Sequence, residues 1–422
     1  MKTAVVRCLL MVGMFAGMFA CQQPRELKLW YTAPARMWEE ALPLGNGRLG
    51  AMPDGGVFRE NITLNDITMW SGSFDETCNP GASRFLPEIR KLLLEGKNDR
   101  AQQLMYRHFA CGGQGSAFGN GADAPYGSFQ LLGNMHLHYF FEDSSSADYS
   151  DYQRSLSLNR AVAWTTFKKG NVKYRREYFV SHTDDVIVII LSADEKNQLN
   201  FDVSLDRPEN FSCYSNDGVV YMEGQLNNGT DGKGNRYLTL MKVLTDGGKQ
   251  VADSAAVHVR GANAACIFLS AGTSLWKADF EQEVAGLMAK AEEMDYEELQ
   301  SRHLAAWKDK FDRVELHLSQ EPDTIPTDRR LIRFQEQDDP ALAALYFQFG
   351  RYLMISGTRE NTLPLNLQGL WAHTIKTPWN GDYHLNINLQ MNYWPSEVTN
   401  LPELHTPLKN LVAGMVPSGE KT

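Results

Sequence analysis

The sequence predicts a large β-sandwich followed by a helical region. Three observations support this prediction: a length of 422 residues, short β-rich runs between about residues 29 and 276, and a change to helical periodicity after residue 276. A hydrophobic content of 43% and a charged content of 22% are typical of folded domains with sizeable cores. We therefore expect two to three domains and no extended disorder.

Charge and cysteine content exclude several classes of function. The formal net charge is −10, from 41 basic and 51 acidic residues, and no basic cluster is visible, so no nucleic-acid partner is expected. The six cysteines show no C-x-x-C spacing, which argues against a zinc site and against a dense disulfide framework. His373, His384 and His405 are too widely spaced to predict a metal site, and no cofactor is expected.

Residues 1–20 are predicted to be a secretory signal peptide. They contain Lys2 and Arg7, then an apolar run too short to span a bilayer, and no acidic residue. The following Met-Phe-Ala-Cys-Gln-Gln-Pro resembles a bacterial lipobox with Cys21 as the lipidated residue, and ordinary cleavage near Ala20 is the alternative. Either way we expect an exported protein, in the periplasm or at the cell surface as an outer-membrane lipoprotein, that touches the membrane only through a lipid on Cys21.

A β-sandwich is expected over residues 28–276. Strands are predicted where β-branched and aromatic runs are bounded by Gly, Asn and Asp. The clearest runs are residues 135–141, 186–191, 199–205, 237–243 and 266–270. A helical island is expected at residues 87–109. The glycine-rich segment 112–121 lacks G-x-G-x-x-G, so it is interpreted as a flexible surface loop, or alternatively as a loop that reaches the mouth of the following domain.

Helices are expected beyond residue 276. Residues 277–328 are predicted to be a helical linker that ends, after a short strand-like run at 314–318, in a polar connection. In residues 329–422, one helix is signalled by Asp338 and Asp339 as caps, Pro340 in its first turn and Gly357 at its end. Another helix begins at Thr406-Pro407. Only about four helices of ordinary length fit into this region, so an all-helical domain would be unfinished.

The most unusual segment spans residues 361–400, which contain three of the nine tryptophans, Trp371, Trp379 and Trp394. Polar and apolar residues alternate strictly from His384 to Asn392. The polar members are His384, Asn386, Asn388, Gln390 and Asn392. A period of two predicts an extended strand with the amides on one face. The ordinary interpretation is a half-buried strand with one solvated side, although asparagine is depleted in strands.

The chemistry of this segment favours a carbohydrate ligand. Amides donate to and accept from hydroxyl groups, and indoles cover the C–H faces of sugar rings. The segment lacks an obvious pair of carboxylates for glycoside hydrolysis. Asp382 lies in the turn formed by residues 380–382 and Glu397 lies near a helix start, so both are interpreted as structural.

Several stretches resemble glycoside hydrolase family 95, the α-L-fucosidases. The catalytic-domain stretches are PLNLQGLW (364–371) and WNGDYHLNINLQMNYWP (379–395). The amino-terminal stretches are LWYTAPA (29–35), WEEALPLGNGRLG (38–50), LNDITMWSG (64–72) and YGSFQLLG (126–133). The resemblance implies an amino-terminal β-sandwich, a helical linker and a carboxy-terminal (α/α)6 barrel, of which this chain would contain only the first helices.

The resemblance also implies a mechanism. Family members invert the anomeric centre, with the attacking water held by two asparagines that match Asn386 and Asn388. An amide is too weak a base to act alone. In the family, a polarising aspartate and an acidic glutamate come from the later part of the barrel, which here would lie beyond Thr422. His384 matches a sugar-contacting position where histidine accompanies fucose preference. Trp371, Trp379 and Asn392 are further candidate substrate contacts.

The expected function is that of an exported, inverting glycoside hydrolase that removes terminal α-L-fucosyl residues from a fucosylated oligosaccharide or glycan. Little turnover is expected from these 422 residues alone, because the acid and the activating aspartate would be missing. Three alternatives stay open: a non-catalytic glycan-binding lipoprotein, an α-L-galactosidase and a related glycoside phosphorylase.

Overall fold

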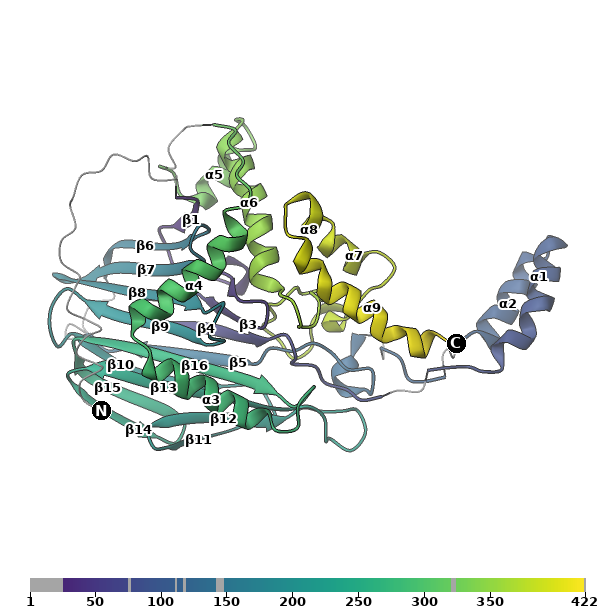
Figure 1. The fold of residues 1–422 in the computed structure, drawn as a ribbon, viewed down its shortest axis with the longest axis horizontal. Coiled ribbons are helices and arrows are strands. Elements are labelled where there is room, and N and C mark those ends of the chain that lie inside the picture. The colour runs from purple at the N-terminus through teal and green to yellow at the C-terminus, as the bar shows by residue number, and fades with distance from the viewer. Residues whose placement is uncertain are drawn as a thin grey trace.

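The computed structural model describes residues 26–74, 77–110, 112–116, 119–141, 148–319 and 324–420. The predicted signal peptide and the lipidation of Cys21 lie outside these residues. The described chain forms a β-sandwich, helices that pack against it, and a further helical region (Figure 1). Across the described ranges, no helix combines the length and the apolar character that a membrane span requires.

Within the described residues, the β-sandwich has sixteen strands in two antiparallel sheets. The strands are β1 (Lys28–Tyr31), β2 (Leu44–Gly45), β3 (Leu49–Pro53), β4 (Arg59–Asp66), β5 (Gly133–Tyr139), β6 (Ser150–Ser157), β7 (Val162–Lys169), β8 (Val172–Val180), β9 (Ile187–Ala193), β10 (Leu199–Asp206), β11 (Ser212–Asn216), β12 (Val219–Gln225), β13 (Arg236–Asp246), β14 (Lys249–Asp253), β15 (Ala256–Ala262) and β16 (Ala264–Thr273). One sheet has the order β1-β6-β7-β8-β9-β16-β13-β12-β11 and the other β14-β15-β10-β5-β4-β3-β2. The predicted β-sandwich is confirmed, and its five clearest strands are β5, β9, β10, β13 and β16.

The alternation of side chains along the seven-stranded sheet explains which face is the core. In β10, Leu199, Phe201, Val203 and Leu205 are buried, whereas the residues between them are partly exposed. Val203 lies opposite Leu137 of β5, which is also buried. Because strand side chains alternate between faces, the apolar set fills the sandwich and the polar set covers the outer surface of this sheet.

The outer face of the nine-stranded sheet is covered by a helix of the linker. The linker helices are α3 (Phe280–Glu293) and α4 (Tyr296–Phe311). Val284 and Met288 of α3 pack with Leu240 and Phe268 of the sheet in one apolar cluster. The predicted amphipathic helices of the linker are therefore confirmed. The predicted strand-like run at 314–318 is wrong, because these residues adopt no regular structure.

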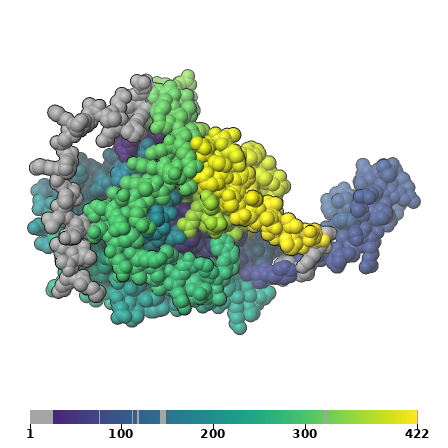
Figure 2. Space-filling model, viewed as in Figure 1, coloured from purple at the N-terminus to yellow at the C-terminus, as the bar shows by residue number. Residues whose placement is uncertain are grey.

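A helical hairpin projects from the body of the molecule (Figures 1 and 2). It consists of α1 (Leu86–Leu94) and α2 (Asn98–His108), which together confirm the helical island expected inside the β-sandwich sequence. Only Ile89, Leu92 and Ala101 of the two helices are buried. The hairpin therefore has a small core of its own.

The helical region forms part of an (α/α)6 barrel. Its helices are α5 (Thr327–Arg333), α6 (Pro340–Gly357), α7 (Asn388–Tyr393), α8 (Pro395–Val398) and α9 (Thr406–Gly419). The predicted limits of α6 are confirmed: Asp339 caps it, Pro340 opens it and it ends at Gly357. Several apolar side chains are exposed on this region, namely Leu385, Ile387, Met391, Trp394, Val398, Val412 and Val416. Such a surface is typical of a partial barrel, because barrel helices bury their apolar stripes against neighbouring helices.

Replacing Asp339 with alanine should destabilise the helical region by roughly 1–3 kcal/mol. Its buried carboxylate accepts hydrogen bonds from the Leu342 amide at 2.8 Å and from Arg330 Nε and Nη2 at 2.9 and 2.8 Å. The hydrogen bond from Arg330 lowers the pKa of Asp339 to about 2. Since this value lies below the ordinary aspartate pKa, the stabilisation is present above about pH 4 and is lost as the pH falls toward 2.

Urea unfolding followed by helical circular dichroism measures this effect. Asp338→Ala is the matched control, because Asp338 is the exposed neighbour of Asp339. The control should change the free energy of unfolding by less than about 0.5 kcal/mol. Equal losses in the two variants at pH 7, or a loss in Asp339→Ala that is undiminished near pH 2, would show that the cap and ion pair do not stabilise α6.

Candidate active site

Residues 384–392 do not form the predicted strand. Residues 385–387 form a turn, and α7 begins at Asn388. The Leu389 amide donates to the His384 carbonyl at 3.1 Å, and the Gln390 side chain donates to the Leu385 carbonyl at 2.6 Å. These local hydrogen bonds explain why the segment is not a strand. They satisfy backbone groups within the segment and so compete with hydrogen bonding to a neighbouring strand. The prediction of a row of amides on one face of a strand is therefore wrong.

The structure separates the candidate amides into two groups. Asn386 and Asn388 are both exposed and flank Ile387 at the junction between the turn and α7. Asn392 is half-buried, and its Nδ2 donates to the carbonyls of Leu365 and Asn366 at 3.4 and 3.3 Å. Asn386 and Asn388 are thus available to a water or a sugar, whereas the side chain of Asn392 already donates hydrogen bonds to backbone carbonyls.

Trp371 is a core residue that joins the two domains. Its side chain is buried, and its Nε1 donates to the Leu44 carbonyl of β2 at 2.9 Å. A Cβ added at Gly45 would lie 3.2 Å from the indole, and one at Gly50 would lie 3.0 Å from Nε1. The indole fills the space that these glycines leave, so this placement favours a structural role over the predicted sugar contact.

Trp379 has the opposite environment. Its side chain is 72% exposed, and it lies in a short 3₁₀ turn, Pro378–Gly381. Trp379, Asn380 and Gly381 have φ values of 49°, 59° and 57°, so three consecutive residues adopt the left-handed region. Non-glycine residues in this region carry strain that the surroundings must hold. An exposed indole on such a fixed turn is suited to stacking against a sugar ring.

A loop of the β-sandwich, residues 119–130, holds this turn in place. The Asn380 carbonyl accepts from the Phe129 amide, and its Oδ1 accepts from the Gly121 amide, both at 2.8 Å. Thr377 Oγ1 donates to the Phe129 carbonyl at 2.8 Å. The end of the glycine-rich segment therefore reaches the helical domain, as the alternative interpretation of that segment expected.

The same loop supplies a residue that sequence reasoning did not assign to the site. Tyr126 donates its hydroxyl proton to Asp382 Oδ2 at 2.6 Å, and the other carboxylate oxygen pairs with His384 Nδ1. Burial and the neighbouring Asp382 raise the pKa of Tyr126, so its hydroxyl keeps the proton that it donates. A carboxylate on Nδ1 fixes the imidazole ring and leaves Nε2 for a ligand. Tyr126 is the first residue of the YGSFQLLG stretch. That stretch supported the family resemblance but did not indicate this contact.

We expect Asp382→Asn to change the tautomer of His384. In the unaltered chain the carboxylate that lies beside Nδ1 favours a proton on that nitrogen. In the variant the proton should redistribute toward Nε2, which long-range ¹H–¹⁵N NMR of the imidazole detects. Glu397→Gln is the matched control, because it changes a carboxylate that lies 2.6 Å from the Nδ1 of another histidine, His405. A variant Asp382→Asn with an unchanged His384 spectrum would contradict the assigned contact.

Glu397 and Asp382 are poorly placed to act as the catalytic acid. Glu397 accepts from Ser396 Oγ at 2.5 Å and pairs with His405, and these contacts lower the pKa of Glu397 to about 2. A general acid needs a pKa near the working pH. Asp382 is engaged by Tyr126 and His384. Their surroundings agree with the structural interpretation of both carboxylates.

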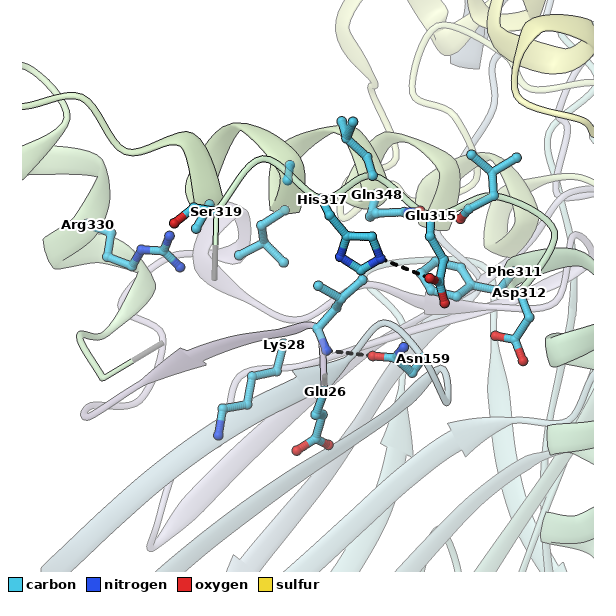
Figure 3. Close-up of a pocket in the computed structure, with 16 residues that line it drawn as sticks. Glu26, Lys28, Asn159, Phe311, Asp312, Glu315, His317, Ser319, Arg330 and Gln348 are labelled. Carbon is cyan, nitrogen blue, oxygen red and sulfur yellow. Dashed lines mark hydrogen bonds and ion pairs between the residues drawn. The ribbon is translucent and has the colours of Figure 1, made fainter. Parts of the chain in front are cut away.

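A cavity elsewhere in the molecule is separate from this site (Figure 3). Its volume is about 90 Å³, and it is lined by the start of β1, residues 311–319 and α6. Polar groups at its wall are already paired: the Leu27 amide donates to Asn159 Oδ1, and His317 pairs with Glu315. None of its lining residues belongs to the 361–400 segment. Among the described residues, no cluster of three His, Cys, Asp or Glu side chains could hold a metal ion.

Comparisons with known proteins agree with the order of domains. Residues 29–277 match the family described as "Glycosyl hydrolase family 65, N-terminal domain", and residues 295–422 match "Glycosyl hydrolase family 95 catalytic domain". "Alpha-L-fucosidase 2" of Arabidopsis thaliana is 32% identical over 436 residues, which cover 94% of this chain and 50% of that protein. "Probable alpha-fucosidase A" of Aspergillus niger is 31% identical over 428 residues, which cover 93% of this chain and 51% of that protein.

Solved structures overlap this chain less closely. A bacterial glucoamylase complexed with acarbose aligns over 62% of this chain and 41% of that chain, with 10% identity and a TM-score of 0.36. The chain spans about half the length of the curated relatives that it matches.

Proposed function

Since this chain belongs to glycoside hydrolase family 95, with an amino-terminal domain of the family 65 type, we propose that it acts on terminal α-L-fucosyl linkages. The observation that carries the proposal is the group formed by His384, Asn386 and Asn388 at one exposed turn. The Tyr126 and Asp382 contacts hold His384 in position beside the two amides. This arrangement offers neutral donors and acceptors to a sugar without offering a charge-matched site to an anion.

The proposed reaction inverts the anomeric centre. Asn386 and Asn388 hold a water molecule, whose oxygen forms a bond to the anomeric carbon while the glycosidic C–O bond breaks. The leaving oxygen must receive a proton from an acid, and the water must give up a proton to a base. Both amides are too weakly basic for this step, and Glu397 is too acidic to donate a proton near neutral pH. We therefore propose that the acidic glutamate and the activating aspartate belong to a segment beyond residue 422.

His384 supports fucose as the sugar in the site. With Nδ1 paired to Asp382, its Nε2 is oriented for a hydroxyl group of the terminal residue. An α-L-galactoside carries one more hydroxyl group than an α-L-fucoside, at the position where fucose has a methyl group. Because a histidine at this position accompanies fucose preference in the family that the chain resembles, the proposal predicts weaker binding of the galactoside. Export through residues 1–20, with Cys21 as a lipid anchor, is part of the same proposal.

A hydrolysis assay on the 422-residue chain tests this proposal against its alternatives. With 2′-fucosyllactose we expect saturable binding and fucose release lowered by roughly 10²- to 10⁴-fold for each missing acid or base group. A matched assay with inorganic phosphate tests for a phosphorylase, which would form a sugar phosphate. Rapid fucose release would contradict the assignment of the acid to another segment and would direct attention to Asp382 and Glu397. A folded chain without any fucoside binding would overturn the proposed substrate.

A further inference from the structure

A second cavity lies on the outer face of the seven-stranded sheet, apart from the proposed site of hydrolysis. Its volume is about 250 Å³. Its walls come from the segment around Trp38, from β3, β4 and β5, and from His373 of the family 95 segment. The lining residues that carry the argument are Trp38, Asp54, Asn61, Thr63, Asn134 and His373. The cavity therefore lies where the β-sandwich meets the catalytic segment.

The strand register explains why polar side chains gather at this cavity. In β4, Asn61 and Thr63 alternate with Ile62 and Leu64, which are buried in the apolar core of the sandwich. Asn134 of β5 lies directly opposite Thr63. Because alternate strand residues share a face, Asn61, Thr63 and Asn134 lie together on the outer side of the sheet.

Two polar atoms of the cavity residues have no protein partner. Trp38 Nε1 and Asn61 Oδ1 are buried, and neither has a hydrogen-bond partner among the described residues. One is a donor and the other is an acceptor. Buried polar atoms are normally hydrogen-bonded, since leaving them unpaired is costly. A hydroxyl group within reach of either atom would supply the missing partner, because a hydroxyl both accepts and donates hydrogen bonds.

The same cavity has a rigid aromatic wall. Trp38 stacks on His373 with 4.5 Å between ring centroids and 26° between the ring planes. Ala35, Ala41 and Met52 add apolar surface to the lining. A pyranose ring presents C–H groups on its faces and hydroxyl groups at its edge, so it matches an aromatic and apolar wall beside unpaired polar atoms.

The charged groups at the cavity are already engaged within the protein. Asp54 accepts from the amides of Gly56 and Asn61 at 2.8 and 3.1 Å, and burial raises the pKa of this carboxyl. Arg36 pairs with Glu40 at 2.8 Å. With these charges paired, the cavity favours a neutral ligand over an anion or a cation.

We propose that this cavity is an accessory carbohydrate-binding site that takes one neutral pyranose unit of a glycan. It is distinct from the site around His384, and it does not depend on the proposed hydrolysis. By binding a second unit of a branched or extended glycan at the domain seam, it would raise the effective concentration of the glycan near the catalytic segment.

Fluorine NMR of the 422-residue chain labelled with 5-fluorotryptophan tests the proposal. The probes are methyl β-D-galactopyranoside and methyl α-L-fucopyranoside, and Trp38→Phe assigns the Trp38 resonance. We expect the Trp38 resonance to shift saturably with at least one probe. Trp276, which is 56% exposed and is not among the cavity residues, should not move. Asn61→Leu and Thr63→Val should each weaken the apparent affinity by about 3- to 10-fold, the range for one lost hydrogen bond.

Ser204→Ala is the matched control, because Ser204 lies on the outer face of the same sheet in β10 and does not line the cavity. This variant should leave the Trp38 titration unchanged. A Trp38 resonance that does not move, that moves without saturation, or that responds equally in Asn61→Leu, Thr63→Val and Ser204→Ala would overturn the accessory site. The NMR signals of His384 report the proposed active site separately, so failure at one site is distinguishable from failure at the other.

Discussion

Replacing Arg176 with methionine is expected to lower the free energy of unfolding of the β-sandwich by roughly 3–5 kcal/mol. Arg176 lies in β8, is almost completely buried and pairs with the buried Glu60 at 2.8 Å. It also donates to the carbonyls of Gly56 and Val57 at 2.5 and 2.7 Å and lies 3.9 Å from the Tyr139 ring centroid. The variant would leave the buried Glu60 carboxylate with hydrogen bonds from Tyr178 and Gly55 but without a cation, and it would remove the guanidinium donor from two carbonyls.

The pH dependence of this loss identifies its cause. Burial raises the pKa of Glu60, and Arg176 opposes that effect. Without the guanidinium, the folded-state pKa of Glu60 rises further above its unfolded value. A raised carboxyl pKa destabilises the fold increasingly as the pH rises above the unfolded pKa, so the loss should be larger at about pH 7 than at pH 4.

Arg175→Met is the matched control for this experiment. Arg175 is the preceding residue, has a side chain that is 44% exposed and pairs with Glu177 at 2.7 Å. Glu177 is buried, but it keeps hydrogen bonds from Tyr296 and Gln300, so the loss of the half-exposed Arg175 should cost less than about 1 kcal/mol. Urea unfolding of both variants, followed by β-sheet circular dichroism, gives the comparison. Similar losses for the two arginines, or a loss for Arg176→Met that is independent of pH, would contradict the buried ion pair as the source of stability.

Trp371→Ala is expected to cost roughly 3–5 kcal/mol and to loosen the contact between the two domains. The variant removes a buried indole together with its hydrogen bond to Leu44, and it leaves a cavity against Gly45 and Gly50. These glycines have no side chain that could fill the space. We therefore expect faster proteolysis of the segment after Trp371 in addition to the loss of stability.

Trp379→Ala is the internal comparison, because the two tryptophans lie in the same segment with opposite exposure. Removing the exposed Trp379 indole should change the free energy of unfolding by less than about 0.5 kcal/mol. It should weaken fucoside binding, because the exposed indole on this turn is suited to stacking on a sugar ring. Thermal unfolding, limited proteolysis and fucoside titration of both variants separate the two roles. A stable Trp371→Ala variant with intact protease resistance would contradict its assignment as the residue that joins the domains.

Local signals in the sequence predicted much of the fold. The limits of α6 followed from an aspartate cap, a proline in the first turn and a terminal glycine, all of which act within one helical turn. The strands of the β-sandwich followed from short β-rich runs bounded by turn residues. The run at 314–318 had the same composition but gained no pairing partner, and a strand requires one.

The site was harder to predict, because its geometry depends on contacts distant in sequence. The alternation from His384 to Asn392 fits a strand, but the segment lies in a turn and a short helix whose hydrogen bonds are local. The Tyr126 contact with Asp382 joins residues 256 positions apart, and no local pattern indicates such a pair. Likewise Trp371 and Trp379 look equivalent in the sequence, and only their tertiary surroundings show which one is buried.

The most direct test of the central claim is an NMR titration of the His384 imidazole in the 422-residue chain with methyl α-L-fucopyranoside. The account predicts a saturable change at Nε2 of His384, a weaker response to methyl α-L-galactopyranoside, and no change at His405, which pairs with Glu397. Asn386→Ala should weaken the response in a chain that remains folded. A His384 signal that stays unchanged at saturating fucoside, while the chain is folded, would contradict the assignment of this turn as the sugar-binding part of a fucosidase site.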